Sequence, residues 1–238
     1  MRKWPKQLAP LSEEQLRIKD DFMTYWHQVL PQKYGLIEHF NHNYPVKGSV
    51  STGRVLELGA GLGEHISYEK LEGLEYYAVE FRPEMAARMK ERFPLVNVIV
   101  ADCQKQLDFP DKFFGRIIAV HVLEHLPDLP SAVIEAHRLL DPKGEFRVVI
   151  PCEGGLAYSL ARRVSAQRIF ERRYKTSYDW FIKTEHINRP HEIMDELQRY
   201  FTVRASAYFP FGIPSISLNL AIGLTLNPRP HPTEPVIV

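Results

Sequence analysis

Short apolar runs alternate with amphipathic segments through the middle of the chain. Apolar runs of strand length occur at about 54–58, 75–80, 96–101, 115–121 and 145–150. Segments with helical spacing of apolar residues lie near 63–70, 83–92 and 130–140, and Pro83 suits the first position of a helix. This alternation predicts an α/β fold with a doubly wound, mostly parallel sheet. A further helix near 190–200 and strands near 201–209 and 216–225 follow.

The first fifty residues have a different, helical pattern. Ser12 is a plausible N-cap for a helix that reaches about Leu30. Its apolar face consists of Leu16, Phe22, Met23, Trp26 and Leu30. A second short helix is predicted after Pro31. These helices either cover a ligand site as a lid or pack against the sheet, and the pattern leaves both open.

Three glycines follow the first apolar run directly, at Gly59, Gly61 and Gly63. Glycine permits a tight turn and lets a ligand approach the main chain closely. The loop is predicted to open a helix at the carboxyl end of a strand, where open α/β sheets bind ligands. The dinucleotide fingerprint needs its last small residue where this chain has Glu64, which disfavours NAD and FAD. The triphosphate-binding loop is absent.

Five motifs in order carry a family resemblance. The chain resembles the class I S-adenosylmethionine (SAM) methyltransferases, in particular those that act on small molecules. The matching segments are Val55–Gly63, Tyr76–Glu80, Asn97–Asp102, Ile117–Leu126 and Leu139–Glu145. The resemblance implies a seven-stranded, Rossmann-like sheet whose last strand is antiparallel. It also implies an N-terminal helical lid over residues 1–50, a SAM-binding domain over 51–238 and an acceptor-recognition insert at about 152–188.

The resemblance assigns roles to residues at the strand ends. Glu80 would bind the ribose hydroxyls, which requires an ionised carboxylate, and Asp102 would contact adenine. His121 would lie against the methionine portion of SAM. The expected cofactor contacts are Glu57, Gly59, Ala60, Gly61, Gly63, Glu80, Phe81, Arg82, Asp102, Cys103 and His121.

Histidines are the candidate catalytic groups. His125 is the first choice as a proton acceptor, His186 the second, and His121 lies in the same motif as His125. A capping or packing role is the alternative for His125 and His186. His121 to His125 also match the H-x-x-E-H pattern of a zinc protease family. That motif needs a helix, but β-like residues precede it and Pro127 follows. No metal ligands are predicted.

The expected reaction is methyl transfer from SAM to a small-molecule acceptor, with S-adenosylhomocysteine as product. A hydroxyl or carboxyl oxygen is favoured over nitrogen because histidines lie near the expected site. Methyltransferases of nucleic-acid amines resemble one another in an Asp/Asn-Pro-Pro-aromatic motif, which is missing after the fourth run. Two alternatives stay open: a non-catalytic SAM-binding protein, and a nicotinamide-dependent oxidoreductase, which Glu64 opposes.

Composition narrows the partners further. The 238 residues carry a formal net charge of +1 and two cysteines, so neither nucleic acid, a membrane nor a disulfide framework is indicated. No secretory signal is visible, which predicts a cytoplasmic protein without stable membrane insertion, as a monomer or homodimer. A basic-aromatic block is either a solvated helix face or a site for an acidic or phosphate-bearing acceptor. It contains Arg162, Arg163, Arg168, Arg172, Arg173 and Lys175 with Phe170, Tyr174, Tyr178, Trp180 and Phe181.

Overall fold

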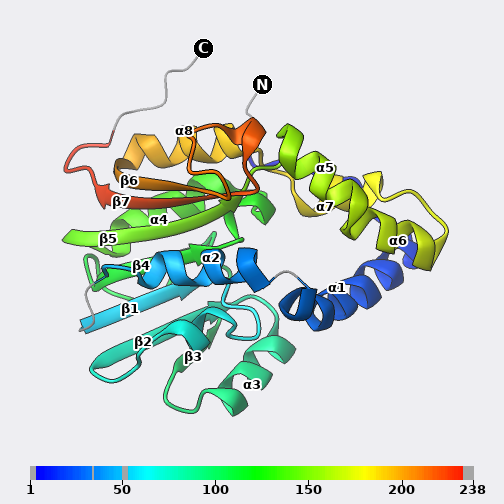
Figure 1. The fold of residues 1–238 in the computed structure, drawn as a ribbon. Coiled ribbons are helices and arrows are strands. Elements are labelled where there is room, and N and C mark those ends of the chain that lie inside the picture. Colours follow the sequence, from blue (N-terminus) through cyan, green and yellow to red (C-terminus); the bar gives the residue numbers. More distant parts are fainter. Residues whose placement is uncertain (1–3, 34, 50–52, 233–238) are drawn as a thin grey trace.

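A seven-stranded sheet forms the centre of the molecule (Figure 1). The computed structural model describes residues 4–33, 35–49 and 53–232. The sheet order is β3-β2-β1-β4-β5-β7-β6, and β7 alone runs antiparallel to its neighbours β5 and β6. The predicted mixed sheet is therefore confirmed. The strands are β1 Gly53–Leu58, β2 Leu74–Glu80, β3 Asn97–Val100, β4 Phe114–Val120, β5 Leu140–Pro151, β6 Phe201–Phe209 and β7 Ala221–Pro228.

Helices cover both faces of this sheet. Helices α4 (Leu129–Leu139) and α8 (Pro190–Tyr200) pack on the face that carries Ile117, and α3 (Pro83–Arg92) packs on the face that carries Ile118. Successive strand residues point to opposite faces, so the continuous apolar run of β4 fills both layers. The three helices lie within one residue of their predicted bounds.

Two predicted elements differ in the structure. The helix expected at 63–70 is only the 3-10 helix η1 (His65–Tyr68), because Gly61 and Gly63 have φ of 60° and 80°. These left-handed conformations interrupt a right-handed helix before it can start. The last strand begins at Ala221 rather than 216, since Ile216–Leu218 form a second short 3-10 helix, η3.

The two N-terminal helices pack in different places. Helix α1 (Glu13–Lys33) begins at Ser12, which exchanges hydrogen bonds with Gln15 as predicted for an N-cap. It packs against the insert helices α6 (Ala166–Tyr174) and α7 (Asp179–Glu185), away from the sheet (Figure 1), and α5 (Leu156–Val164) in turn packs against α6. We call α1 and α5–α7 the cap. The predicted face residues Trp26 and Leu30 have side chains outside the described part of the chain.

Aromatic side chains form the cap core. Phe22 of α1 is 2% exposed and meets Phe170 and Phe181 edge-on, at ring distances of 5.0 and 5.2 Å. The aromatic side chains of the basic-aromatic block thus pack in the core of the cap. Of its cations, Arg162 points inward to Glu153 and Arg173 pairs with Asp21 of α1. Among the described residues, no helix is long and apolar enough to cross a bilayer.

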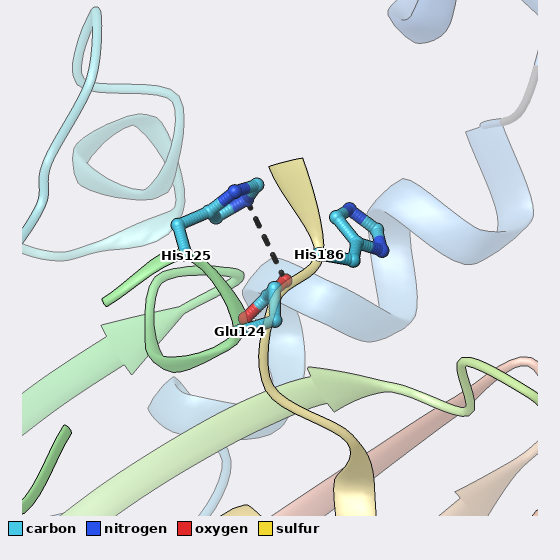
Figure 2. Close-up of side chains that lie close together, drawn as sticks. All are labelled: Glu124, His125 and His186. Atoms are coloured by element: carbon cyan, nitrogen blue, oxygen red, sulfur yellow. Dashed lines mark ion pairs between the residues drawn. The ribbon is translucent and has the colours of Figure 1, made fainter. Parts of the chain in front are cut away.

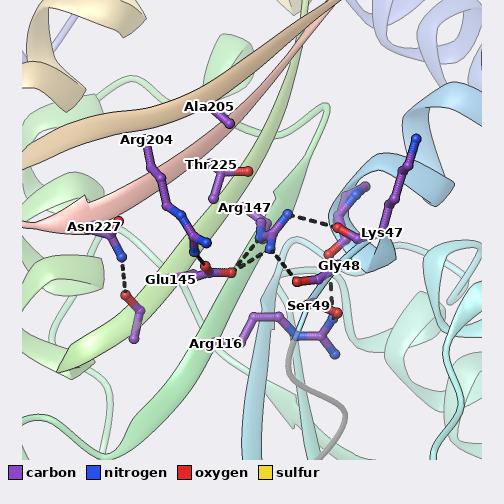
Figure 3. Close-up of polar contacts among 12 residues, drawn as sticks. Lys47, Gly48, Ser49, Arg116, Glu145, Arg147, Arg204, Ala205, Thr225 and Asn227 are labelled. Atoms are coloured by element: carbon purple, nitrogen blue, oxygen red, sulfur yellow. Dashed lines mark hydrogen bonds and ion pairs between the residues drawn. The ribbon is translucent and has the colours of Figure 1, made fainter.

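Helix α2 (Gly35–Val46) packs on the sheet instead. Two buried arginines of the sheet bind its carboxyl end (Figure 3). Arg147 donates to the carbonyl oxygens of Lys47 and Gly48, at 3.2 and 3.4 Å, and Arg116 donates to Ser49 Oγ at 2.6 Å. Only the first helix of the expected lid is therefore part of the cap.

Candidate functional site

The glycine loop after β1 has two packed glycines and one open glycine. A Cβ on Gly59 would lie 2.7 Å from a methyl group of Val122, and a Cβ on Gly63 would lie 2.6 Å from the Phe93 ring. A Cβ on Gly61 would meet nothing closer than Glu64 Oε2, at 3.3 Å. The main chain at Gly61 is thus a cradle that a side chain would fill.

Glu80 ends β2 directly beside this cradle. Its carboxylate, 5% exposed, accepts hydrogen bonds from the Gly61 N–H at 2.9 Å and from the Arg82 N–H at 3.0 Å. Phe81, the next residue, is 70% exposed, an unusual position for a large aromatic ring. The structure therefore brings Gly61, Glu80, Phe81 and Arg82 together, as the sequence predicted.

Asp102 follows β3, the neighbour of β2. One of its carboxylate oxygens accepts from the main chain and side chain of Gln104, at 3.0 and 2.9 Å. Because β2 and β3 are parallel, Glu80 and Asp102 lie at the same edge of the sheet. The edge thus carries one carboxylate on each of two adjacent strands.

Three other predicted cofactor contacts are buried beneath this edge. Glu57 is 3% exposed and accepts a hydrogen bond from the Tyr76 hydroxyl at 2.9 Å, and burial raises its pKa to about 8. Ala60 donates its N–H to Val79, and Cys103 is buried with its pKa raised to about 12. These residues support the loop from inside, and their direct contact with a cofactor stays a prediction.

His121 stands where β4 ends, in a strained conformation. Its φ is 53°, which a β-carbon makes unfavourable, yet its N–H still bonds to Val149 of β5. Its Nδ1 lies 3.1 Å from Glu124 Oε1. Strain of this kind is often found at functional sites.

Glu124, His125 and His186 meet next to this turn (Figure 2). Their potential ligand atoms lie within 4.8 Å of one another. His125 belongs to the 3-10 helix η2 (Leu123–His125), whereas His186 follows α7 of the cap, and the two rings meet edge-on at 5.1 Å. The structure therefore brings all three predicted catalytic histidines to one side of the strand ends.

Two further carboxylates stand behind these rings. Glu153 accepts from His186 Nδ1 at 3.2 Å and pairs with Arg162 at 2.6 Å. Glu185 Oε2 lies 3.9 Å from His125 Nδ1, and its other oxygen lies 2.6 Å from Lys19 of α1. The cluster thus draws charged groups from α1, the end of β5 and α7.

Burial and neighbouring charges shift the pKa values here. Burial alone would raise the pKa of Glu124, but the hydrogen bond from His121 and the nearby histidines lower it to about 2. Burial opposes a charge on His121, yet Glu124 outweighs this and raises its pKa. Burial lowers the pKa of His125, and His186 adds to the effect. Glu124 is therefore ionised at neutral pH.

Asn188, which sequence reasoning missed, holds the turn that carries Glu124 and His125 in place. It is fully buried, and its side-chain amide donates to the carbonyl oxygens of Leu123 and Leu126, at 2.7 and 2.8 Å. Its N–H donates to the carbonyl oxygen of Glu124 at 3.0 Å. Sequence reasoning also assigned no role to Glu124, Glu153 or Glu185. The repeated Glu-His pair at 124–125 and 185–186 was a signal that could have found two of them.

The family comparison agrees with this geometry. Residues 56–148, which contain the glycine loop, both strand-end carboxylates and the Glu124 turn, match the family described as "Methyltransferase domain". The chain carries a class I SAM-dependent methyltransferase domain. The methyltransferase match ends before the insert, so the cap helices lie outside it.

Curated relatives match only this part of the chain. A malonyl-[acyl-carrier protein] O-methyltransferase of Halorhodospira halophila is 32% identical over 96 residues, which are 38% of this chain and 32% of that protein. A phosphatidylethanolamine N-methyltransferase of Cereibacter sphaeroides is 29% identical over 103 residues, 41% of this chain and 50% of that protein. The chain thus spans a third to a half of the length of these two relatives, whose acceptor atoms differ.

Solved structures extend the fold likeness over most of the chain. A TehB-like SAM-dependent methyltransferase from Corynebacterium glutamicum has a TM-score of 0.62 at 13% identity, covering 90% of this chain and all of that one. A SAM-dependent methyltransferase from Mesorhizobium loti has a TM-score of 0.57 at 16% identity, covering 81% and 98%. At these identities the likeness concerns the fold alone.

The strand-end residues fit SAM, the cofactor of this family. The cradle at Gly61 leaves room for a ligand against bare main chain. Glu80 and Asp102 offer acceptors at the strand ends, which suits a nucleoside with hydroxyl and amino donors. The cation beside them, Arg82, is paired with Glu80 through its Nε at 3.2 Å. The exposed Phe81 ring offers a face for a base to stack on.

Proposed function

We propose that this chain transfers the methyl group of SAM to an oxygen atom of a small-molecule acceptor held at the histidine cluster. The observation that carries the proposal is the placement of that cluster. It lies after β4 at the same sheet edge as the cofactor residues, and the cap supplies His186 to it. An acceptor bound beneath the cap would therefore lie beside the cofactor.

The protein's part in this reaction is alignment and exclusion of water. SAM, when bound, supplies an activated methyl carbon on a sulfonium, and the C–S electron pair remains on sulfur in the product. Glu80 and the Gly61 main chain would hold the nucleoside end in place. The cap reaches the cluster through Tyr158 of α5 and through Glu185 of α7, which Lys19 of α1 binds, and it would keep the acceptor in line and dry.

A histidine of the cluster would accept the proton that the acceptor loses. His121 Nδ1 and His186 Nδ1 already face carboxylates at 3.1 and 3.2 Å. The carboxylate oxygens that face the two nitrogens of His125 are 3.9 Å away, beyond hydrogen-bond distance. His125, whose side chain is 34% exposed, is thus the ring placed to accept a proton from an acceptor hydroxyl, with His186 as the second choice.

The acceptor itself remains part of the proposal. The two relatives methylate oxygen and nitrogen by their names, so the shared domain does not select the atom. The histidine cluster favours oxygen, because a hydroxyl needs to lose a proton whereas a free amine mainly needs desolvation. An acidic or phosphate-bearing acceptor stays a prediction, which the exposed Arg163, Arg168 and Arg172 support.

The deciding experiment is an acceptor screen that detects released S-adenosylhomocysteine. Wild type and the His125→Ala variant would be compared, with His191→Ala as control because His191 is an exposed histidine of α8. We expect turnover at least 100-fold lower in His125→Ala than in the control. SAM binding by calorimetry without release of product from any acceptor would support a binding protein instead.

A further inference from the structure

Glu124 carries a buried oxygen that has no partner. The residue is 0% exposed, and its Oε1 bonds to His121. Its Oε2 has no hydrogen-bond partner among the described residues. A buried carboxyl oxygen left without a partner is unfavourable, and such an atom in a native fold calls for a ligand or another explanation.

A carboxylate lies behind each of the two histidines beside it. Glu153 is hydrogen-bonded to Nδ1 of His186 at 3.2 Å, whereas Glu185 Oε2 lies 3.9 Å from Nδ1 of His125, too far for a hydrogen bond. The opposite nitrogen of His125, Nε2, faces Glu124 Oε1 at 3.9 Å. A carboxylate on the outer nitrogen of an imidazole is the usual support of a metal-binding histidine, because it fixes the ring and makes the inner nitrogen more basic.

We propose that Glu124, His125 and His186 bind one divalent transition-metal cation, such as Zn²⁺ or Mn²⁺. Two imidazole nitrogens and one carboxylate oxygen suit these ions better than Mg²⁺ or Ca²⁺, which prefer oxygen ligands. The three ligand atoms lie within 4.8 Å of one another (Figure 2). Ligands about 2.1 Å from an ion stand roughly 3.4 Å apart in a tetrahedral site, so small side-chain rotations would close the set.

This site differs from the zinc-protease motif that the sequence contains. That motif would use His121 and His125 from one helical face. Here β4 ends at Val120, and His121 bonds to Glu124 instead of facing the cluster as a ligand. The third ligand, His186, comes from 61 residues beyond His125, after the cap. The proposed ligand set therefore differs from the pair in that pattern, and the sequence analysis, which predicted no metal ligands, weighed that pair alone.

The catalytic role of the cation rests on the proposed function, to which it adds a metal-bound acceptor oxygen. Three protein ligands leave a position for an acceptor hydroxyl, whose pKa a bound cation lowers. The O–H bond would break with the proton leaving to solvent, and the oxygen's electron pair would form the bond to the methyl carbon as the C–S pair stays on sulfur. The lone pair of His125 would then hold the cation rather than accept the proton.

Calorimetry on the full chain tests the site directly. After treatment with a chelator, wild type is titrated with Zn²⁺ and with Mn²⁺. We expect binding at one ion per chain. His186→Ala and Glu124→Gln should each weaken it at least tenfold, and Glu153→Gln about tenfold, because it removes the support behind His186. His191→Ala should bind as wild type does.

Two results would overturn the inference. One is the absence of binding by either ion, and the other is equal affinity in wild type and His186→Ala. Circular dichroism of each variant checks that it is folded, and Glu124→Gln keeps the shape of the buried side chain. SAM is titrated into the same samples, so a chain that binds the metal but not SAM would contradict the proposed function and leave the metal site intact.

Discussion

The proposed cofactor side of the site and its proposed acceptor side are built in different ways. The residues expected to bind the cofactor lie at or just after the ends of parallel strands, between Glu57 and His121. The acceptor side is assembled from segments as distant as Lys19 of α1 and His186 after α7. The first is fixed by the sheet, and the second depends on how the cap packs. Each side should therefore respond separately to mutation.

The largest expected effect is on the cap. Phe22→Ala removes the ring that joins α1 to α6 and α7, where Phe170 and Phe181 are its neighbours. Loss of a buried Phe costs about 3–5 kcal/mol. If the two sides are independent, this loss loosens the cap and stops turnover while SAM binding persists. Hydrogen exchange and calorimetry check this, and loss of SAM binding in a folded variant would contradict the separation.

The next effect concerns the cofactor side alone. Glu80→Ala removes the carboxylate that accepts from Gly61 and that we expect to bind the ribose. Hydrogen bonds to a charged group contribute about 1.5–3 kcal/mol each, so losing two should weaken SAM binding about 100-fold or more. Glu75→Gln, at an exposed position of β2, is the matched control. Calorimetry with SAM measures both, and similar affinities in the two variants would refute the assignment.

A third effect depends on pH and arises beneath the loop. The pKa of Glu57 is about 8 in the folded chain, well above the 4.5 of an exposed glutamate. Between these values the folded chain holds one proton more than the unfolded chain, so stability is full at low pH and falls as pH rises. The slope approaches about 1.4 kcal/mol per pH unit.

The Glu57→Gln variant has no carboxyl group at this position, so it lacks this pH dependence. Denaturant unfolding of wild type and variant from pH 5 to pH 8 should therefore give a difference in stability that changes with pH in favour of the variant. Other groups that titrate, such as the buried His65, cancel in this difference. A difference that does not change with pH would place the pKa of Glu57 near its ordinary value.

The smallest expected effect separates binding from stability within the loop. The Cβ of Gly61→Ala meets only the flexible ends of side chains, Glu64 Oε2 at 3.3 Å and Met85 Cε at 3.9 Å. The substitution should therefore cost about 1–2 kcal/mol, mainly for its left-handed conformation, yet fill the cradle and weaken SAM binding. Gly59→Ala, by contrast, collides with Val122 and should destabilise the fold more. Thermal unfolding with and without SAM compares the two. Unchanged SAM affinity in Gly61→Ala would mean that the cofactor does not approach there.

The same difference explains what could be predicted from the sequence. The strands and the helices at 83–92, 129–139 and 190–200 follow from local apolar periodicity, and Glu80 and Asp102 follow from strand ends. The helix at 63–70 failed because positive φ at Gly61 and Gly63 cannot be read from spacing. Glu153, Glu185 and Asn188 were missed because their partners lie in other segments, and only the packing of the cap brings them together.

The three hydrogen bonds of Asn188 have a consequence for how such an enzyme could change its substrate. They fasten the chain to the Leu123–Leu126 turn immediately after His186, at the point where the insert returns to the sheet. Substitutions at exposed positions of α5 and α6, such as Arg163 and Arg168, should therefore leave the histidine in place, whereas Arg162 of α5 reaches it through Glu153. New acceptor preferences could evolve on those helices while the reactive groups kept their positions.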